Sequence, residues 1–268
     1  MIRRGIDINL RSLDRFSMLV HGDYNTFKTY LVGSFMASLI RQGKRVIFWN
    51  MSGESLSTLA NFPEIIPKEH IWTLETYQDL EQASAELLAK PVDGLGVDSG
   101  KLWAAKLTLK YTDGEDRPLR VPKGRGDGSS EWPNMIHKMT NMMVSLRQYA
   151  EQVITTCPSD LAVSHLDPST DAWTKVKKIA PDLPGQKLPS ASNGWFDFVG
   201  YAEVQTVSQG ERRRLLHFEN NTSSTTRANV VTAFKEAIKI PDCSPPYKGP
   251  NAWEIVQAEL LAHLGQKG

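Results

Sequence analysis

Short apolar runs alternate with amphipathic segments through the first two thirds of this 268-residue chain. Six runs have the composition and length of strands: Ser17–Gly22, Lys44–Asn50, Val92–Ser99, Asp160–Asp167, Phe196–Val207 and Arg212–Asn220. Three segments have the pattern of helices: Thr29–Gly43, Thr76–Pro91 and Trp132–Ile154. Strands that alternate with helices at these spacings predict an α/β fold, with a mostly parallel sheet wrapped by helices.

The end of the chain departs from this alternation. Only the letters "SQGE" separate the last two predicted strands, which favours an antiparallel hairpin at the end of the sheet. The segment Ser244–Gly265 begins with prolines and continues as one amphipathic helix, which either docks on a neighbour or packs on its own core. We therefore expect one domain over residues 1–243, followed by a Pro-rich linker and tail helix over residues 244–268.

The turn after the first strand resembles a phosphate-binding loop with altered glycines. The stretch "VHGDYNTFKTYL" lies between a predicted strand and a predicted helix, which is the context that such a loop requires. Its opening glycine and its closing Lys-Thr pair are present. The candidate nucleotide-binding residues are Gly22, Asp23, Tyr24, Asn25, Thr26, Phe27, Lys28 and Thr29.

Two positions of this loop that are glycine in the usual pattern carry larger residues here. Asn25 replaces a middle glycine, and Asn tolerates a positive φ better than most residues. Phe27 stands at the helix entrance, where a negative φ suffices, so the loop can accommodate its side chain if that side chain points away from the nucleotide. Lys28 is then the phosphate-binding lysine, and Thr29 offers its hydroxyl to magnesium. The alternative is a tight turn into a helix whose lysine has no such role.

Polar residues follow three other predicted strands, where ligands of parallel sheets bind. Asp98 ends the third strand in "VDS" and is a candidate magnesium carboxylate; the alternative is a capping residue. Glu54 follows the second strand and is a candidate general base, or else a solvated glutamate at a helix start. His165 ends the predicted fourth strand in "VSHLD" and is a candidate hydrogen-bond donor to the γ-phosphate, or else a structural histidine.

The bulk composition excludes several classes of protein. Lys plus Arg number 31 and Asp plus Glu number 30, so only local basic patches would attract nucleic acid. The two cysteines form no CxxC pair, which argues against a structural zinc site and suits a reducing compartment. No apolar run approaches the ~18 residues that span a bilayer, and the N-terminus lacks the apolar core of a secretory signal. We expect a cytosolic protein with no membrane partner.

From Met18 to Asn229 the pattern resembles the RecA-like ATPase core, and within it the phage ATP-binding proteins classed as RecA-type single-strand annealing recombinases. The resemblance rests on "GDYNTFKT", "VDS", "VSHLD" and the "TTRAN" stretch after the sixth strand. It implies that ATP and Mg²⁺ bind the loop and that Glu54 is the catalytic glutamate. It also implies that His165 senses the γ-phosphate and that Arg227 reaches a neighbouring protomer's nucleotide.

Two Gly-, Pro- and charge-rich interruptions, Tyr111–Glu131 and Asp167–Gly194, fall where RecA-like proteins carry mobile DNA-binding loops. Cations and an aromatic side chain there suit sequence-tolerant binding of single-stranded DNA. The alternative is a pair of solvated loops, because acidic residues are interspersed. The candidate DNA-binding residues are Arg120, Lys123, Arg125, Trp173, Lys175, Lys177 and Lys178.

The resemblance therefore implies an ATPase that assembles with copies of itself on single-stranded DNA, in phage recombination, annealing or repair inside a bacterial host. One rival interpretation keeps the ATPase but makes it a ring-forming helicase or loader. A second is a nucleotide-binding scaffold that does not hydrolyse ATP.

Overall fold

A computed structural model describes residues 13–51, 56–112, 119–120, 131–161, 165–167, 172–174, 179–184, 188, 192–207, 212–218, 227–228, 236–241 and 249–265. The strands are β1 (Phe16–Gly22), β2 (Val46–Met51), β3 (Ile71–Leu74), β4 (Val92–Asp98), β5 (Ala150–Leu161), β6 (His165–Asp167), β7 (Ala172–Thr174), β8 (Ile179–Pro181), β9 (Phe198–Thr206), β10 (Arg212–His217), β11 (Arg227–Ala228) and β12 (Ile238–Ile240). The helices are α1 (Lys28–Arg41), α2 (Pro67–His70), α3 (Tyr77–Ala89), α4 (Gly100–Tyr111), α5 (Glu131–Tyr149) and α7 (Ala252–Gly265), with 3₁₀ turns η1 (Ser57–Asn61) and η2 (Ser192–Gly194).

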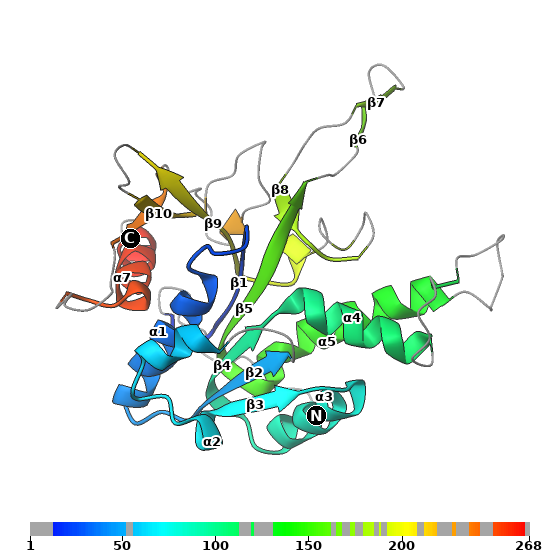
Figure 1. Cartoon of the computed structure of the whole chain (residues 1–268), viewed down its shortest axis with the longest axis horizontal. Helices are drawn as coiled ribbons and strands as arrows, with labels where there is room; N and C mark the ends of the chain where they lie inside the picture. The colour runs from blue at the N-terminus through cyan, green and yellow to red at the C-terminus, as the bar shows by residue number, and fades with distance from the viewer. Residues whose placement is uncertain are drawn as a thin grey trace.

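Ten of the twelve described strands form one sheet, whose main path runs β12-β10-β9-β1-β5-β4-β2-β3 (Figure 1). From β9 to β3 every neighbouring pair on this path is parallel. The strands β10, β11 and β12 add antiparallel pairs at the other end. The predicted fold class is confirmed: the chain has an α/β architecture with a mostly parallel sheet, a late hairpin of β9 and β10, and a tail helix.

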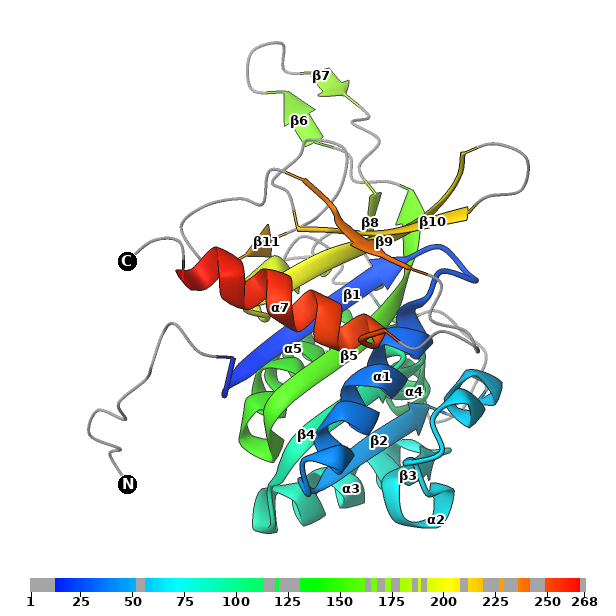
Figure 2. The same cartoon turned by 90° about the vertical axis from the view of Figure 1, so that its left-hand side faces the viewer.

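Helices cover the two faces of the sheet unequally (Figure 2). On one face, α1 and α7 pack over β1 and its neighbours and enclose a core that includes Phe35, Phe198 and Trp253. On the other face, α3, α4 and α5 enclose a second core around Trp49, Trp103 and Leu146. All seven residues of β1 are buried, as expected for a central strand with helices on both sides.

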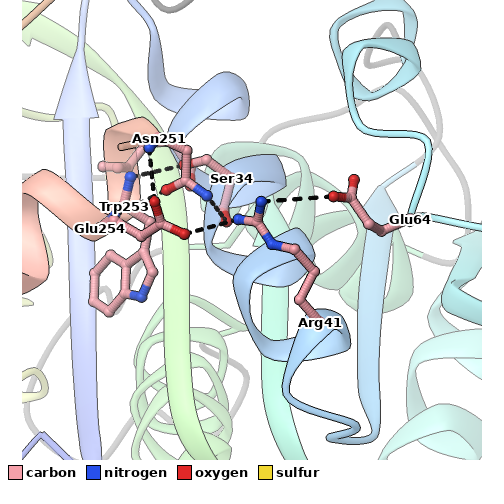
Figure 3. A network of polar contacts seen from close by, with 7 residues as sticks. Ser34, Arg41, Glu64, Asn251, Trp253 and Glu254 are labelled. Carbon is pink, nitrogen blue, oxygen red and sulfur yellow. Dashed lines mark hydrogen bonds and ion pairs between the residues drawn. The ribbon is translucent and has the colours of Figure 1, made fainter. Parts of the chain in front are cut away.

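The tail helix α7 packs on its own chain, as one of the two sequence alternatives predicted. The Trp253 ring stacks on Phe16 with ring centroids 5.4 Å apart. The backbone N–H of Trp253 donates to Ser34 Oγ at 3.0 Å. The Arg41 guanidinium pairs with Glu254 at 2.8 Å and with Glu64 at 3.7 Å (Figure 3). These contacts fasten α7 along α1, the helix that follows the candidate loop.

The prediction of the fourth strand was wrong in its boundaries. The strand β5 spans Ala150–Leu161, so the helix that was expected to continue to Ile154 ends at Tyr149. His165 lies on β6, which pairs with β7 in a separate two-stranded sheet. The run "VITTC" in β5 is apolar and β-branched, and it fits a buried strand between β1 and β4 better than a helix end.

Two further features differ from the sequence expectations. The strand β3 pairs in parallel with β2 at the edge of the sheet and was not predicted. The interruption Asp167–Gly194 was expected to be structureless, yet it contains β7, β8 and η2. In particular, β8 pairs antiparallel with the end of β5. Short strands of this kind carry too few residues to show a period in the sequence.

Candidate functional site

The candidate loop lies where the sequence placed it. Gly22 ends β1, Lys28 begins α1, and the residues between them form the turn. The strands β5 and β4 lie between β1 and β2 in the sheet and run parallel to both, so the carboxyl ends of all four strands point to the same edge. Ligands of open parallel sheets bind at this edge, beyond the carboxyl ends of the strands.

The loop backbone accommodates Asn25 in the place of the middle glycine. Asn25 adopts a φ of 62°, and it is the one non-glycine residue with a positive φ in the described part of the chain. This confirms the conformation predicted for Asn25. Gly22 is required by its neighbours: a Cβ atom there would lie 2.3 Å from the Ala202 carbonyl oxygen of β9. The turn therefore keeps a glycine where β9 approaches and uses Asn where the chain needs a positive φ.

Phe27 points into the protein and not into the turn. It precedes α1 with a φ of −67°, is 7% exposed, and belongs to the core cluster that α1 forms with the sheet. The sequence left open whether the Phe27 side chain would face away from the loop, and the structure places it in the core. The ring thus anchors the start of α1 in the core, and it leaves the turn itself free of an aromatic side chain.

The Lys28 ammonium group is held inside the turn. Its Nζ donates to the carbonyl oxygens of Gly22 at 2.9 Å and Asp23 at 2.6 Å, and to Thr26 Oγ1 at 3.0 Å. The Thr26 hydroxyl in turn donates to the Asp23 carbonyl at 2.8 Å. Because an ammonium group has three N–H donors, these contacts fix a positive charge at the centre of the loop.

The loop also offers backbone donors. Within the described residues, the N–H groups of Asn25, Phe27 and Thr29 have no hydrogen-bond acceptor. The last of these lies in the first turn of α1, where the helix dipole favours an anion. Free N–H groups, a helix N-terminus and a buried lysine together are the groups that hold phosphate oxygens. The residues present thus fit a phosphate group.

A carboxylate lies beside the loop. Thr29 Oγ1 donates to Asp98 Oδ2 at 2.7 Å, and the hydroxyl of Thr156 donates to the other oxygen, Oδ1. Asp98 is 4% exposed at the end of β4, and Thr156 is fully buried in β5. Oxygen ligands of this kind suit magnesium, which usually takes one or two protein ligands together with waters and phosphates. The site's chemistry therefore fits a magnesium ion as well.

Thr156 is a site residue that the sequence reasoning missed. The predicted helix ended at Ile154 and the predicted fourth strand began at Asp160, so Thr156 fell in the connection between them and not on a strand. A signal was present, because "TTC" follows an apolar β-branched run and could have been taken as a strand end.

A row of rings borders the strand that enters the loop. His21 Nδ1 and Ser159 Oγ share a hydrogen bond of 2.9 Å, and the His21 ring lies 5.5 Å from the Tyr201 ring. Next in the row, His217 lies 5.8 Å from Tyr201 and pairs with Glu203 at 2.9 Å. Burial raises the pKa of Tyr201, and the charges of Asp23 and Glu203 raise it further. This row ties β1 to the β9–β10 hairpin.

A cation lies at the start of α4, near the loop. Lys101 pairs with Asp182, and its hydrogen bond with that carboxylate raises the pKa of the ammonium group. Tyr24, in the loop, is 68% exposed and also interacts with Lys101. The rim of the site thus carries an exposed aromatic ring beside a paired charge.

The remaining predicted residues come from other segments of the chain. Arg120 is exposed and pairs with Glu131, at 3.8 Å between its Nε and the carboxylate. Arg227 lies on β11 opposite Val199, and Trp173 lies on β7 opposite Leu166. The candidates outside the described residues are Glu54, Lys123, Arg125, Lys175, Lys177 and Lys178.

Among the described residues, no helix is both long and apolar enough to cross a bilayer. No family model matches the sequence, and no curated protein is similar to it. One solved structure that resembles the chain is the KaiC-like protein of the hyperthermophilic archaeon Pyrococcus horikoshii OT3. The two share 14% identity with a TM-score of 0.49, over 88% of this chain and 87% of the other. A likeness this slight carries no conclusion about function.

Proposed function

We propose that this protein is a RecA-like P-loop ATPase that binds ATP with Mg²⁺ and hydrolyses it. The observation that carries the proposal is the hydrogen bond from Thr29 Oγ1 to Asp98 Oδ2, formed directly beside the loop that encloses the Lys28 ammonium. A turn into a helix needs neither a buried carboxylate nor a buried lysine. A triphosphate with its metal needs both.

Each residue has a role in this proposal. The loop from Gly22 to Thr29 surrounds the phosphates, and the Lys28 ammonium binds their oxygens. To bind the phosphates, the ammonium group exchanges some of its hydrogen bonds to the Gly22 and Asp23 carbonyl oxygens for hydrogen bonds to phosphate oxygens. Thr29 and Asp98 hold Mg²⁺, which when bound neutralises charge on the phosphates. Glu54 takes the proton of the attacking water as general base.

The proposal also covers the biological task of the ATPase. Binding at an interface between protomers would place Arg227 near a neighbour's phosphates, and His165 would report the nucleotide to the basic loops. The loops around Lys123 and around Lys177 would then bind single-stranded DNA in phage recombination, annealing or repair. Support comes from the resemblance of the sequence to RecA-type annealing recombinases and from the number of cations in the two loops.

The test is ATP hydrolysis by the purified chain with and without single-stranded DNA. We expect wild type to hydrolyse ATP faster with DNA, and Lys28→Ala to lose both nucleotide binding and turnover. Lys68→Ala is the matched control, because Lys68 is an exposed lysine on α2, outside the loop. Turnover that persists in Lys28→Ala would refute the role of Lys28. Binding without turnover in wild type would favour the nucleotide-binding scaffold.

Particle size and salt dependence test the rest. Filaments on DNA, seen by negative-stain microscopy, would support the recombinase, and closed rings would support a helicase or loader. DNA affinity should fall as salt rises, because contacts to phosphate release counterions. Reversing the charges of Lys177 and Lys178 should weaken binding; unchanged affinity would remove that loop from the proposal.

A further inference from the structure

Asn50, near the carboxyl end of β2, has a buried amide oxygen that lacks a hydrogen-bond partner in the described part of the chain. Its side chain is 5% exposed, and its Oδ1 atom accepts no hydrogen bond among the described residues. A buried amide oxygen in this state costs free energy, because it has lost its water without gaining a donor. Such groups are uncommon in native proteins, and each one calls for an explanation such as a ligand or an ordered water.

The sheet places this amide beside the proposed magnesium site. Asn50 of β2 is the register partner of Asp98 of β4, and these two strands are neighbours (Figure 1). Neighbouring strands lie ~4.8 Å apart, and residues in register point to the same face. That face carries α1, from which the Thr29 hydroxyl reaches Asp98. Asn50, Asp98 and the loop therefore converge on one edge of the sheet.

The other buried polar atoms without partners have different surroundings. The indole nitrogens of Trp49 and Trp103 and the Thr155 hydroxyl lie with the opposite core, which α3, α4 and α5 cover. Gln152 leaves its oxygen without a partner, but its amide nitrogen donates to the Leu13 carbonyl at 3.0 Å. Among the residues that the structure describes, only Asn50 combines an unpaired buried atom with a position next to Asp98.

We propose that Asn50 is a positioning residue for the metal site: its amide oxygen accepts a hydrogen bond from a water bound to the Mg²⁺ that Thr29 and Asp98 hold. This inference rests on the proposed function. A carbonyl acceptor suits a metal-bound water, which is a strong hydrogen-bond donor, and an acceptor that holds such a water orients the groups that bind the metal directly. Removing it should weaken Mg²⁺ binding while leaving the contacts of Lys28 with phosphate in place.

The test compares Asn50→Leu with Thr155→Val. Both variants replace an unpartnered buried polar group by an apolar group of similar size, on opposite faces of the sheet. We expect both to unfold, without nucleotide, at or above the wild-type temperature, because neither loses a hydrogen bond. The discriminating measurement is the Mg²⁺ concentration that gives half of the thermal stabilisation by ATP. It should rise about tenfold in Asn50→Leu and stay at the wild-type value in Thr155→Val.

Asn50→Asp extends the test in case Asn50→Leu fails to fold. It keeps the shape and supplies only acceptors, so its Mg²⁺ requirement should match or fall below that of wild type. An Asn50→Leu requirement equal to that of Thr155→Val, or an Asn50→Asp requirement well above wild type, would overturn the inference and leave the proposed ATPase intact. If wild type gains no stability from ATP with Mg²⁺, the proposed function fails, and the inference fails with it.

Discussion

The hydroxyl of Thr29, in the first turn of α1, donates a 2.7 Å hydrogen bond to the Asp98 carboxylate at the end of β4. The two residues are 69 positions apart in the chain. Their contact joins the loop after β1 to the second strand along the sheet, past β5. Asp98 is held from its other side by Thr156. The carboxylate is thereby fixed in direction before any ligand arrives, which is the state that a metal site requires.

The Thr29 hydroxyl gives the first prediction. Thr29→Ser keeps an oxygen for Mg²⁺ and for Asp98, whereas Thr29→Val keeps the shape and removes the oxygen. We expect Thr29→Val to lose about 10- to 100-fold in Mg²⁺-dependent ATP affinity, and Thr29→Ser to stay within a few-fold of wild type. Isothermal titration with ATP at several Mg²⁺ concentrations measures the difference. Equal affinities of the two variants would contradict the assignment of Thr29.

Gly22 gives the second prediction. Because a Cβ atom would meet the Ala202 carbonyl at 2.3 Å, Gly22→Ala must push β9 away from the loop. We expect it to lower the free energy of unfolding by about 1–3 kcal/mol, the usual range for overpacking. Gly194→Ala is the control, because no atom lies within 4 Å of its added Cβ. Urea denaturation compares the two variants. A Gly22→Ala variant as stable as wild type would contradict the prediction, because it would mean that β9 moves away from the loop at little cost in free energy.

Phe27 gives the third prediction. Restoring the glycine of the usual loop pattern by Phe27→Gly should damage this protein, because the ring is 7% exposed and belongs to the core. Removing a buried aromatic ring costs about 3–5 kcal/mol. The measurement is again urea denaturation, with nucleotide affinity as a second readout. A variant that is as stable as wild type and binds ATP more tightly would mean that Phe27 only obstructs the loop.

The tail helix gives the fourth prediction. Trp253 is 1% exposed and contacts both Phe16 and Phe35, with ring centroids 5.4 and 5.2 Å away. Trp253→Ala should lower the free energy of unfolding by about 3–5 kcal/mol, because removing the ring leaves a cavity beneath α7. Leu261→Ala, on the exposed side of the same helix at 40% exposure, should change stability by less than about 0.5 kcal/mol. Similar losses in both variants would argue that α7 does not dock as described.

The start of α3 gives a fifth prediction, on pH. Thr76 and Asp79 form a capping box, and hydrogen bonds from Thr76 lower the pKa of the Asp79 carboxyl. A lowered folded-state pKa stabilises the protein above the carboxyl's unfolded value, and this contribution disappears as pH falls through the folded value. Asp79→Asn should therefore be less stable than wild type at pH 7, and the difference in stability should disappear as the pH falls through the lowered folded-state pKa of Asp79. Thermal unfolding at several pH values measures this, and a pH-independent gap would exclude the charge as its cause.

The architecture was largely readable from the sequence because its signals are local. The apolar run of β1, the turn at Gly22 and the amphipathic pattern of α1 are each contained in a few consecutive residues. The same holds for Asn25, whose tolerance of a positive φ is a property of the residue itself. The β9–β10 hairpin was also predictable, because a short polar connection between two strands favours antiparallel pairing.

The boundary of β5 was not predictable in the same way. A helix that passes directly into a strand at Tyr149 and Ala150 leaves no proline or glycine to mark the change. Misplacing this boundary put His165 at the sheet edge and hid Thr156. Whether His165 or Thr156 lies at the carboxyl edge of the sheet depends on how β5 pairs with β1 and β4, and these strands are distant from β5 in sequence.

The sequence by itself determined the α/β class, the loop with its Lys-Thr pair, and the candidate carboxylate, because each rests on the chemistry of neighbouring residues. Only the tertiary structure decided that Phe27 turns into the core, that Thr29 meets Asp98, and that Asn50 stands beside that carboxylate without a partner. The physical reason is that burial and hydrogen bonding across strands are set by register and packing between distant segments. No single stretch of a chain encodes those on its own.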